Sequence, residues 1–146
     1  MTNQEKKKWL LEYRRLEQNI ERDMEELPRL ESRAEKITSM VSDMPKGSQQ
    51  GDSLQRSVEK ICELKVSLNQ RIDAAVEKRK EIETVIETLE DKTLQLLLRY
   101  RYIDGMTWEQ ITVKMRYDYR WVLRLHGRAL ERLTIESHIK SVITLN

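Results

Sequence analysis

The stretch that decides the fold covers residues 96–133 and reads LLLRYRYIDGMTWEQITVKMRYDYRWVLRLHGRALERL. Just before this stretch and within it up to Gly105, apolar residues recur at the spacing of one helix face, and they are Leu94, Leu97, Leu98, Tyr102 and Ile103. We expect this helix to end at Gly105, because glycine adopts a left-handed turn at little cost.

Two further helices are predicted by their start signals. Thr107 and Gln110 have the spacing of a capping box, so a second helix is expected to begin there and to continue to Met115. Asp118 can cap a third helix only three residues after Met115. Two helices joined by so short a turn form a helix-turn-helix unit, whose second helix can lie in the major groove of DNA.

The third predicted helix separates an apolar face from a cationic one. With about 100° per residue and Arg120 at zero, one set of residues lies between about 140° and 220° and is expected to be buried. Arginines follow beside it at about 40°, 80° and 120°. The apolar set is Val122, Leu125, Ala129 and Leu133, and the arginines are Arg124, Arg128 and Arg132.

Acidic residues hardly balance these arginines. From Arg116 in the turn to Arg132, an arginine stands at every fourth position, and only Asp118 and Glu131 are acidic in between. Residues 91–146 hold 10 basic and 6 acidic groups, a net +4, within a chain of net +2. Guanidinium groups along one edge suit phosphates on both sides of a groove, and a bidentate arginine can also read guanine.

The same stretch resembles region four of bacterial sigma factors. It is more similar to the carboxyl-terminal domain of phage transcriptional regulators of the RinA and ArpU type. The matching residues are Leu98-Arg99-Tyr100, Gly105, Thr107-Trp108-Glu109-Gln110-Ile111 and His126-Gly127-Arg128-Ala129-Leu130. The resemblance covers roughly 40 residues and implies a DNA-binding regulator in a bacterial host cell, with RNA polymerase or a sigma factor as a further possible partner. Thr112 and Arg116 depart from it, since such families usually carry a small residue and a glycine there.

We therefore expect sequence-specific binding of double-stranded DNA by this region. Arg120 and Arg124 with Trp121 are predicted to face base edges, and Arg116, Arg128 and Arg132 to hold phosphates. Trp121 and Leu123 stand where polar residues are expected, so they touch either thymine methyls or a protein partner. The predicted DNA-binding set is Arg116, Tyr119, Arg120, Trp121, Leu123, Arg124, Gly127, Arg128 and Arg132.

The first 90 residues predict a long antiparallel helical hairpin of coiled-coil character. Apolar residues recur every three or four positions in two runs. Thr2 and Glu5 predict a helix start near residue 3, Pro28 predicts a kink or short break, and residues 45–53 have the composition of a turn. The first run is Trp9, Tyr13, Leu16, Ile20, Met24, Leu27, Leu30, Ala34, Ile37, Val41 and Met44, and the second is Leu54, Val58, Ile61, Leu68, Ile72, Ala75, Ile82, Ile86 and Leu89.

A single hairpin would leave part of its apolar surface exposed to solvent. The residues of this predicted stripe are Leu10, Leu11, Cys62, Leu64, Val76 and Val85. Docking of a partner or of a second copy, as in a homodimer, would cover it. A rigid spacer is the alternative. Cys62 is the only cysteine, so a buried, inert thiol is expected and a disulfide within the chain is excluded.

Composition sets the fold class and excludes several functions. The 146 residues are 36% charged, with 4 Gly, 2 Pro and no Phe, which favours an all-α protein over a sandwich, barrel or βα-repeat enzyme.

No nucleophile elbow, phosphate loop or catalytic constellation is present, so we expect no enzyme and no cofactor. His126 and His138 lack further ligands, so no metal is expected, and His126 is interpreted as a phosphate or helix-packing contact. The absence of a signal or membrane-spanning segment predicts a cytoplasmic protein.

The predicted organisation is a hairpin at 1–90, a helix-turn-helix domain at 91–133 and a tail at 134–146, which either extends the last helix or packs back. Two other functions remain open. One is a DNA-packaging adaptor resembling a small terminase subunit, although in those proteins the DNA-binding part usually comes first. The other is an interaction protein that binds polymerase or sigma factor without touching DNA.

Overall fold

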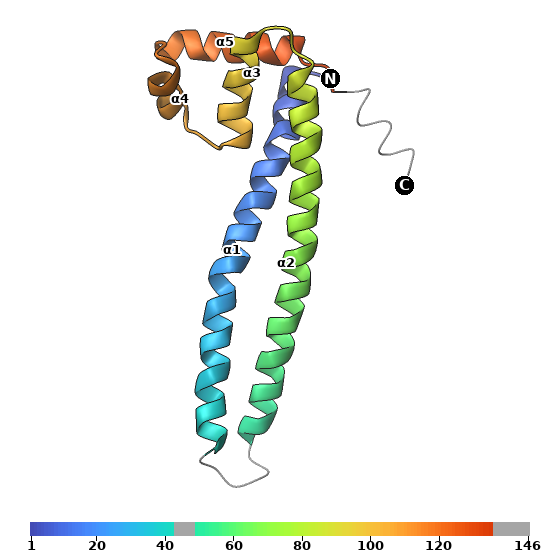
Figure 1. Cartoon of the computed structure of the whole chain (residues 1–146), viewed down its shortest axis with the longest axis vertical. Coiled ribbons are helices and arrows are strands. Elements are labelled where there is room, and N and C mark those ends of the chain that lie inside the picture. The colour runs from blue at the N-terminus through green and yellow to red at the C-terminus, as the bar shows by residue number, and fades with distance from the viewer. Residues whose placement is uncertain (43–48, 136–146) are drawn as a thin grey trace, which may run out of the picture. The chain divides into compact units, whose positions relative to one another are not determined.

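The computed structural model describes residues 1–42 and 49–135. All secondary-structure elements of these residues are helical, which confirms the all-α prediction. They are α1 (Asn3–Ser42), α2 (Gln49–Glu87), α3 (Lys92–Leu98), the π-helical turn η1 (Arg99–Ile103), α4 (Trp108–Met115) and α5 (Tyr119–Arg132) (Figure 1).

Helix α1 begins where the capping box predicts. The amide of Thr2 donates to Glu5 Oε2 at 2.9 Å, and the amide of Glu5 donates to the Thr2 hydroxyl at 3.2 Å. The helix then continues through Pro28, so the predicted short break is absent. Pro28 is exposed, so the carbonyl that loses its amide donor there can turn to water.

Helix α2 begins earlier than predicted. Residues 49–53, assigned to a turn from their composition, already belong to the helix, and Asp52 lies in its first turn, where a carboxylate stabilises the exposed amides. The remainder of the predicted turn falls at residues 43–48, outside the described part of the chain. Helix propensity within the long run of α2 therefore outweighs the turn signal of Gly51 and its neighbours.

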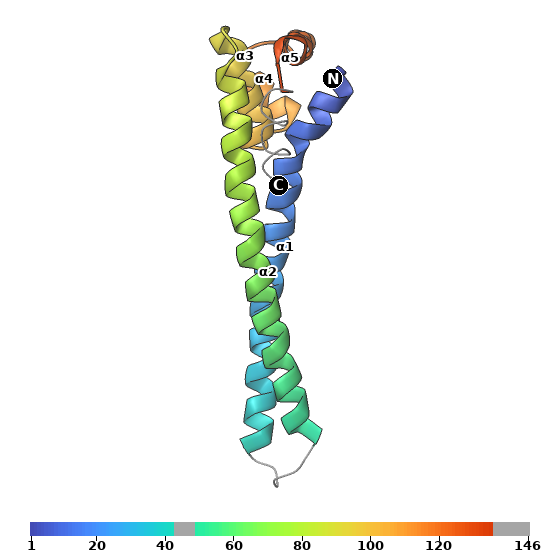
Figure 2. The same cartoon turned by 90° about the vertical axis from the view of Figure 1, so that its right-hand side faces the viewer.

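The chain divides into two compact units. One comprises Leu16–Ala74, in which segments of α1 and α2 lie side by side and run in opposite directions (Figures 1 and 2). Its buried residues include Ile20, Asp23, Ser57 and Leu68. Arg71 of α2 forms an ion pair with Asp23 of α1, which satisfies the charge of this buried carboxylate.

Three predicted core positions of this unit are wrong. Met24 is 58% exposed, Val58 is 46% exposed and Ile72 is 38% exposed. Asp23, Ser57 and Arg71 take the inward positions instead, one residue earlier along each helix. The ion pair with Arg71 offsets the desolvation cost of burying the Asp23 carboxylate. A search for apolar spacing alone does not detect such a buried ion pair.

The other unit joins Met1–Arg15 to Ala75 and the residues that follow it. Leu10, Ile82, Val85 and Ile86 are all fully buried in it. The prediction that this stripe is exposed to solvent is therefore wrong for Leu10 and Val85. Here α1 and α2 belong to one compact unit with α3, α4 and α5. Lys6 shows this contact directly, because its Nζ donates to the carbonyl of Leu130 in α5 at 2.8 Å.

The rest of the predicted stripe gives a mixed result. Cys62 is exposed, so the expectation of a buried thiol is wrong, and Val76 is 47% exposed, as predicted. Leu11 and Leu64 are half-buried. Beyond α5, Leu133 and Ile135 are buried in a non-helical segment, while residues 136–146 of the predicted tail lie outside the described residues.

Candidate nucleic-acid interface

The platform beneath the candidate site is the helix formed by α3 and η1. Asp91 caps α3 by accepting hydrogen bonds from the amides of Thr93 and Leu94, at 2.9 and 3.4 Å. Leu94, Leu97, Leu98, Tyr102 and Ile103 are buried, as the sequence predicts. The last turn widens to a π-helix, in which the amide of Asp104 donates to the carbonyl of Arg99 at 2.9 Å.

The turn after η1 is held by two arginines. Gly105 has φ +69°, the left-handed conformation predicted for it. The Arg14 guanidinium occupies the place where a β-carbon of Gly105 would stand, so a side chain there would require Arg14 to move. Arg101 donates from Nη1 to the carbonyl of Met106 at 3.0 Å and stacks 4.5 Å from the Trp108 ring. These contacts fix the entry into α4.

Helix α4 begins with the predicted capping box. The Thr107 amide donates to Gln110 Oε1 at 2.9 Å, and the Gln110 amide donates to the Thr107 hydroxyl at 3.2 Å. Ile111 is fully buried beneath the helix. After Met115 the chain turns at Arg116, whose φ of 60° and ψ of 38° place a non-glycine residue in the left-handed region. That conformation costs about 1 kcal/mol.

Helix α5 begins after Asp118, whose carboxylate accepts from the amide of Trp121 at 2.8 Å. Its inner face packs against α3 and α4. The predicted burial of Val122, Leu125, Ala129 and Leu133 is confirmed, and the buried face is wider than predicted because His126 and Leu130 also belong to it.

His126 serves helix packing. Its Nε2 and the Tyr102 hydroxyl are joined by a hydrogen bond of 2.6 Å, and Trp108 meets its ring edge to face at 4.6 Å between centroids. Burial, with Lys7 and Arg101 nearby, lowers the pKa of His126 to about 4, and burial raises the pKa of Tyr102 to about 12. Both groups are therefore uncharged at neutral pH, and His126 offers no positive charge to a phosphate.

The predicted cations lie on the outer face of α5 and in the turn before it. Arg116, Arg120, Arg124, Arg128 and Arg132 are all exposed, and none of them forms an ion pair with a described residue. The two nearby acids do not neutralise them, because Asp118 caps the helix and Glu131 is exposed one turn beyond Gly127.

The remaining predicted residues surround these arginines. Tyr119 is 47% exposed and Leu123 is 39% exposed, while Trp121 is half-buried with the Arg128 guanidinium 5.2 Å from its ring. Gly127 lies on α5 between Arg124 and Arg128. A β-carbon added at Gly127 would have no neighbouring atom within 4 Å. Its surface is open.

Arg132 differs from the other four arginines. It borders a hollow formed with Thr88, Leu89, Glu90 and Asp91, at the connection between α2 and α3. Two carboxylates in that hollow reduce the positive charge that Arg132 can present to a ligand. The predicted set thus separates into four arginines grouped around the first three turns of α5 and one near its end.

Sequence reasoning missed two features of this region. Lys114, in the last turn of α4, is exposed and adds a further cation close to Arg116. The cluster of Arg101, Tyr102, Trp108 and His126 was not foreseen, and it accounts for two of the aromatic residues in this stretch. Its only sequence signal is the density of aromatic residues, with six of the chain's eight between Tyr100 and Trp121.

Over the described residues, the fold and site define a small all-helical protein whose helix α5 exposes arginines without an ion-pair partner there. The chain belongs to the family described as "Protein of unknown function (DUF1492)", whose profile matches residues 32–134, which is 103 of the 146 residues. No curated protein and no solved structure matches the chain. Within the described residues, no helix has the length and hydropathy to cross a membrane, and no three His, Cys, Asp or Glu side chains group as a metal site requires.

Burial of neutral His126 makes stability depend on pH. Its pKa is about 4 in the folded protein against 6.5 for a free side chain, so the unfolded chain binds the proton more readily. This contribution to stability is complete above pH 6.5 and falls by about 1.4 kcal/mol per pH unit as the pH drops toward 4. We expect urea unfolding to show a steeper loss between pH 6.5 and 4.5 for the native protein than for His126→Gln. Parallel curves for the two proteins would contradict this assignment.

Proposed function

We propose that the protein binds double-stranded DNA sequence-specifically through α5 and acts as a transcriptional regulator of phage or prophage type. In this proposal α4, the turn at Arg116 and α5 form a helix-turn-helix like that of sigma region four. Helices α1 and α2 form a coiled-coil-like hairpin, which dimerises or contacts polymerase. The protein is no enzyme and needs no cofactor.

The observation that carries this proposal is the charge on the outer face of α5. The arginines there are exposed and unpaired within the described residues, while the opposite face of the same helix is buried. An unpaired arginine gains most from a ligand with regularly spaced negative charges, and the phosphates of duplex DNA supply them. The resemblance to phage regulators supports the same ligand.

The arginines divide by their position along the helix. Arg120 and Arg124 lie near the start of α5 at the centre of its outer face, where a helix in the major groove meets base edges. Arg116 and Arg128 lie to either side and are placed for phosphates. Arg132 is the weakest member of the set, since it stands beside Glu90 and Asp91.

Salt dependence tests the electrostatic part of the proposal. If about five arginines each neutralise a phosphate, the logarithm of the association constant falls against log salt with a slope near −4.5. Arg124→Ala should weaken binding and bring the slope about 0.9 closer to zero. Arg33→Ala, which removes an exposed arginine of α1, is the matched control and should leave both unchanged. Titration of a selected duplex at several salt concentrations measures the slope, and a flat response would refute the proposal.

A substitution at Arg116 should affect the stability of the fold and the binding of DNA in opposite directions. Arg116→Gly relieves the left-handed conformation, so we expect the free energy of unfolding to stay the same or rise by up to about 1 kcal/mol. Loss of a phosphate contact should weaken DNA binding by about 3- to 10-fold in the same variant. Urea unfolding and fluorescence anisotropy measure the two effects. Unchanged affinity in the glycine variant would remove Arg116 from the interface.

Gly127 tests close approach of DNA to the helix. Gly127→Ala meets no atom within 4 Å, and alanine favours an α-helix over glycine by about 1 kcal/mol, so the protein should become more stable. A methyl group between the helix and a groove should nevertheless weaken DNA binding by about 10-fold or more. Gly51→Ala in α2, equally free of neighbouring atoms, is the matched control and should raise stability without affecting DNA. Equal DNA affinity in the two variants would exclude close approach at Gly127.

A further inference from the structure

Two rows of residues lie side by side on the outer face of α5. Residues four positions apart on a helix lie on the same side, about one turn from each other. The second row follows the first by one residue, which is about 100° around the helix. The rows are the apolar row, with Tyr119, Leu123 and Gly127, and the arginine row, with Arg120, Arg124 and Arg128.

Leu123 is the exposed aliphatic side chain of the apolar row. It is 39% exposed, whereas Val122, Leu125 and Leu130 of the same helix are buried. One turn before it, Tyr119 is 47% exposed, and one turn after it, Gly127 adds no side chain to the surface. Leu123 therefore presents an apolar group in the middle of a face that is otherwise cationic.

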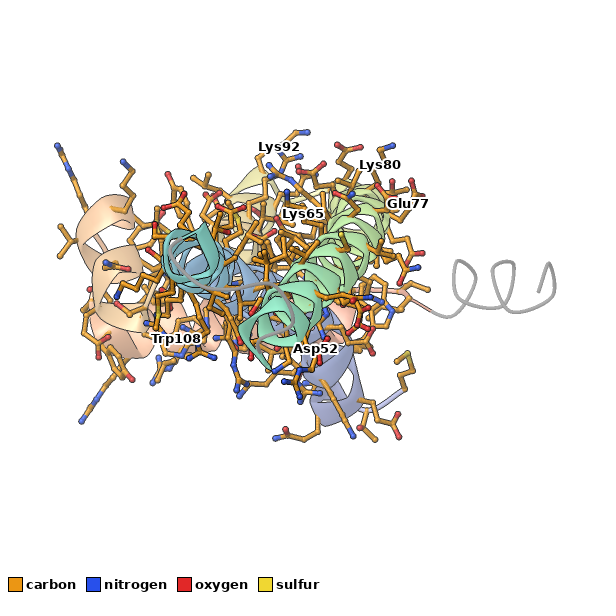
Figure 3. The ribbon with its side chains drawn as sticks, turned by 90° about the horizontal axis from the view of Figure 1, so that it is seen from below. Asp52, Lys65, Glu77, Lys80, Lys92 and Trp108 are labelled. Atoms are coloured by element: carbon orange, nitrogen blue, oxygen red, sulfur yellow. The ribbon has the colours of Figure 1, made fainter. Side chains whose placement is uncertain are left out.

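The two tryptophans of this region are already engaged within the molecule. Trp108, at the start of α4 (labelled in Figure 3), lies 4.5 Å from the Arg101 guanidinium and packs edge to face against His126. Trp121 is half-buried, and the Arg128 guanidinium lies 5.2 Å from its ring. Of the two residues that the sequence offers for thymine or for a protein partner, Trp121 is thus engaged by Arg128, and Leu123 is left.

The composition of α5 restricts which bases the helix can read. Side-chain amides read adenine and carboxylates read cytosine in the major groove, whereas arginine reads guanine and apolar groups contact the methyl group of thymine. Helix α5 contains no Asn, Gln, Ser, Thr or Asp, and its one acid, Glu131, stands in the last turn. The first turns of its outer face therefore hold groups for guanine and for thymine alone.

We propose that Leu123 contacts the 5-methyl group of a thymine in the major groove, next to a guanine bound by Arg120 or Arg124. This assignment rests on the proposed binding of DNA by α5 and names the bases that the helix reads. Leu123 is the specificity-determining residue for the thymine.

The charges beside Leu123 favour DNA over a protein as the group that covers it. Arg120 stands three residues before Leu123 and Arg124 directly after it, and neither forms an ion pair with a described residue. A surface that covers Leu123 must also meet these two guanidinium groups. A protein would have to supply a carboxylate for each of them, since a buried charge needs a partner. The major groove offers guanine acceptors and thymine methyl groups side by side, with phosphates along both edges.

Removal of a single methyl group from the DNA tests this contact. Selection from a random pool should enrich a duplex with a guanine and a thymine in neighbouring base pairs. Deoxyuridine in place of that thymine removes the methyl group and leaves the hydrogen-bonding groups of the base unchanged. The replacement should weaken binding of the whole chain by about 4-fold, the effect of burying one methyl group. Fluorescence anisotropy with each thymine replaced in turn measures it.

A variant of Leu123 shows whether this residue reads the methyl group. Leu123→Ala should weaken binding to the thymine duplex by about 4-fold or more, and deoxyuridine should then change its affinity by less than about 2-fold. Because leucine carries no charge, the salt slope should stay at the native value. Leu96→Ala removes a leucine of α3 that is 41% exposed, so it is the matched control and should keep the affinity and the methyl dependence of the native protein. Circular dichroism checks that both variants keep their helices.

Two results would overturn the assignment. One is equal affinity of the native protein for the thymine duplex and for every deoxyuridine duplex. The other is a Leu123→Ala variant that discriminates against deoxyuridine as strongly as the native protein does. In either case a steep salt dependence would leave the proposed binding of DNA standing, whereas failure to bind any duplex would refute that function and this assignment together.

Discussion

Everything at the candidate interface depends on burial of one face of α5. Val122 and Ala129 are completely buried, and His126 on the same face is buried and hydrogen-bonded to Tyr102. Because the histidine ring is neutral, it can be enclosed without a counter-charge. The enclosed face fixes the rotation of α5 about its own axis, and that rotation directs Arg120 and Arg124 to the outside.

The exposed side of the helix-turn-helix region carries a strained backbone at Arg116 and an open glycine surface at Gly127. Arg116 occupies a backbone conformation that glycine would adopt more cheaply, and Gly127 occupies a helix position that alanine would favour. Among the described residues, neither Arg116 nor Gly127 has a partner that explains the choice. Natural sequences depart from local preference mainly where function demands it, so both departures argue that this face meets a ligand.

Sequence predicted the helices between residues 92 and 132 well because their signals are local. The caps at Thr107 and Asp118 and the left-handed Gly105 each depend on residues within one turn. The long helices were predicted less well, because the choice between neighbouring seams depends on the partner helix. Asp23 points inward only because Arg71 comes from a segment 48 residues away to meet it. Leu10 and Val85 were predicted to be exposed to solvent for a similar reason. Both are buried in the unit that includes the later helices, and periodicity along α1 and α2 does not reveal that packing.

The errors at Val58 and Ile72 have one physical origin. Both residues follow the three-and-four spacing of a helix face, but they lie one residue, or about 100°, beyond the face of α2 that holds Ser57, Leu68 and Ala75. Spacing within one helix does not distinguish two faces that differ by so small a rotation. The pairing of Asp23 with Arg71 distinguishes them, because a buried carboxylate needs its counter-charge and therefore fixes which face of each helix turns inward.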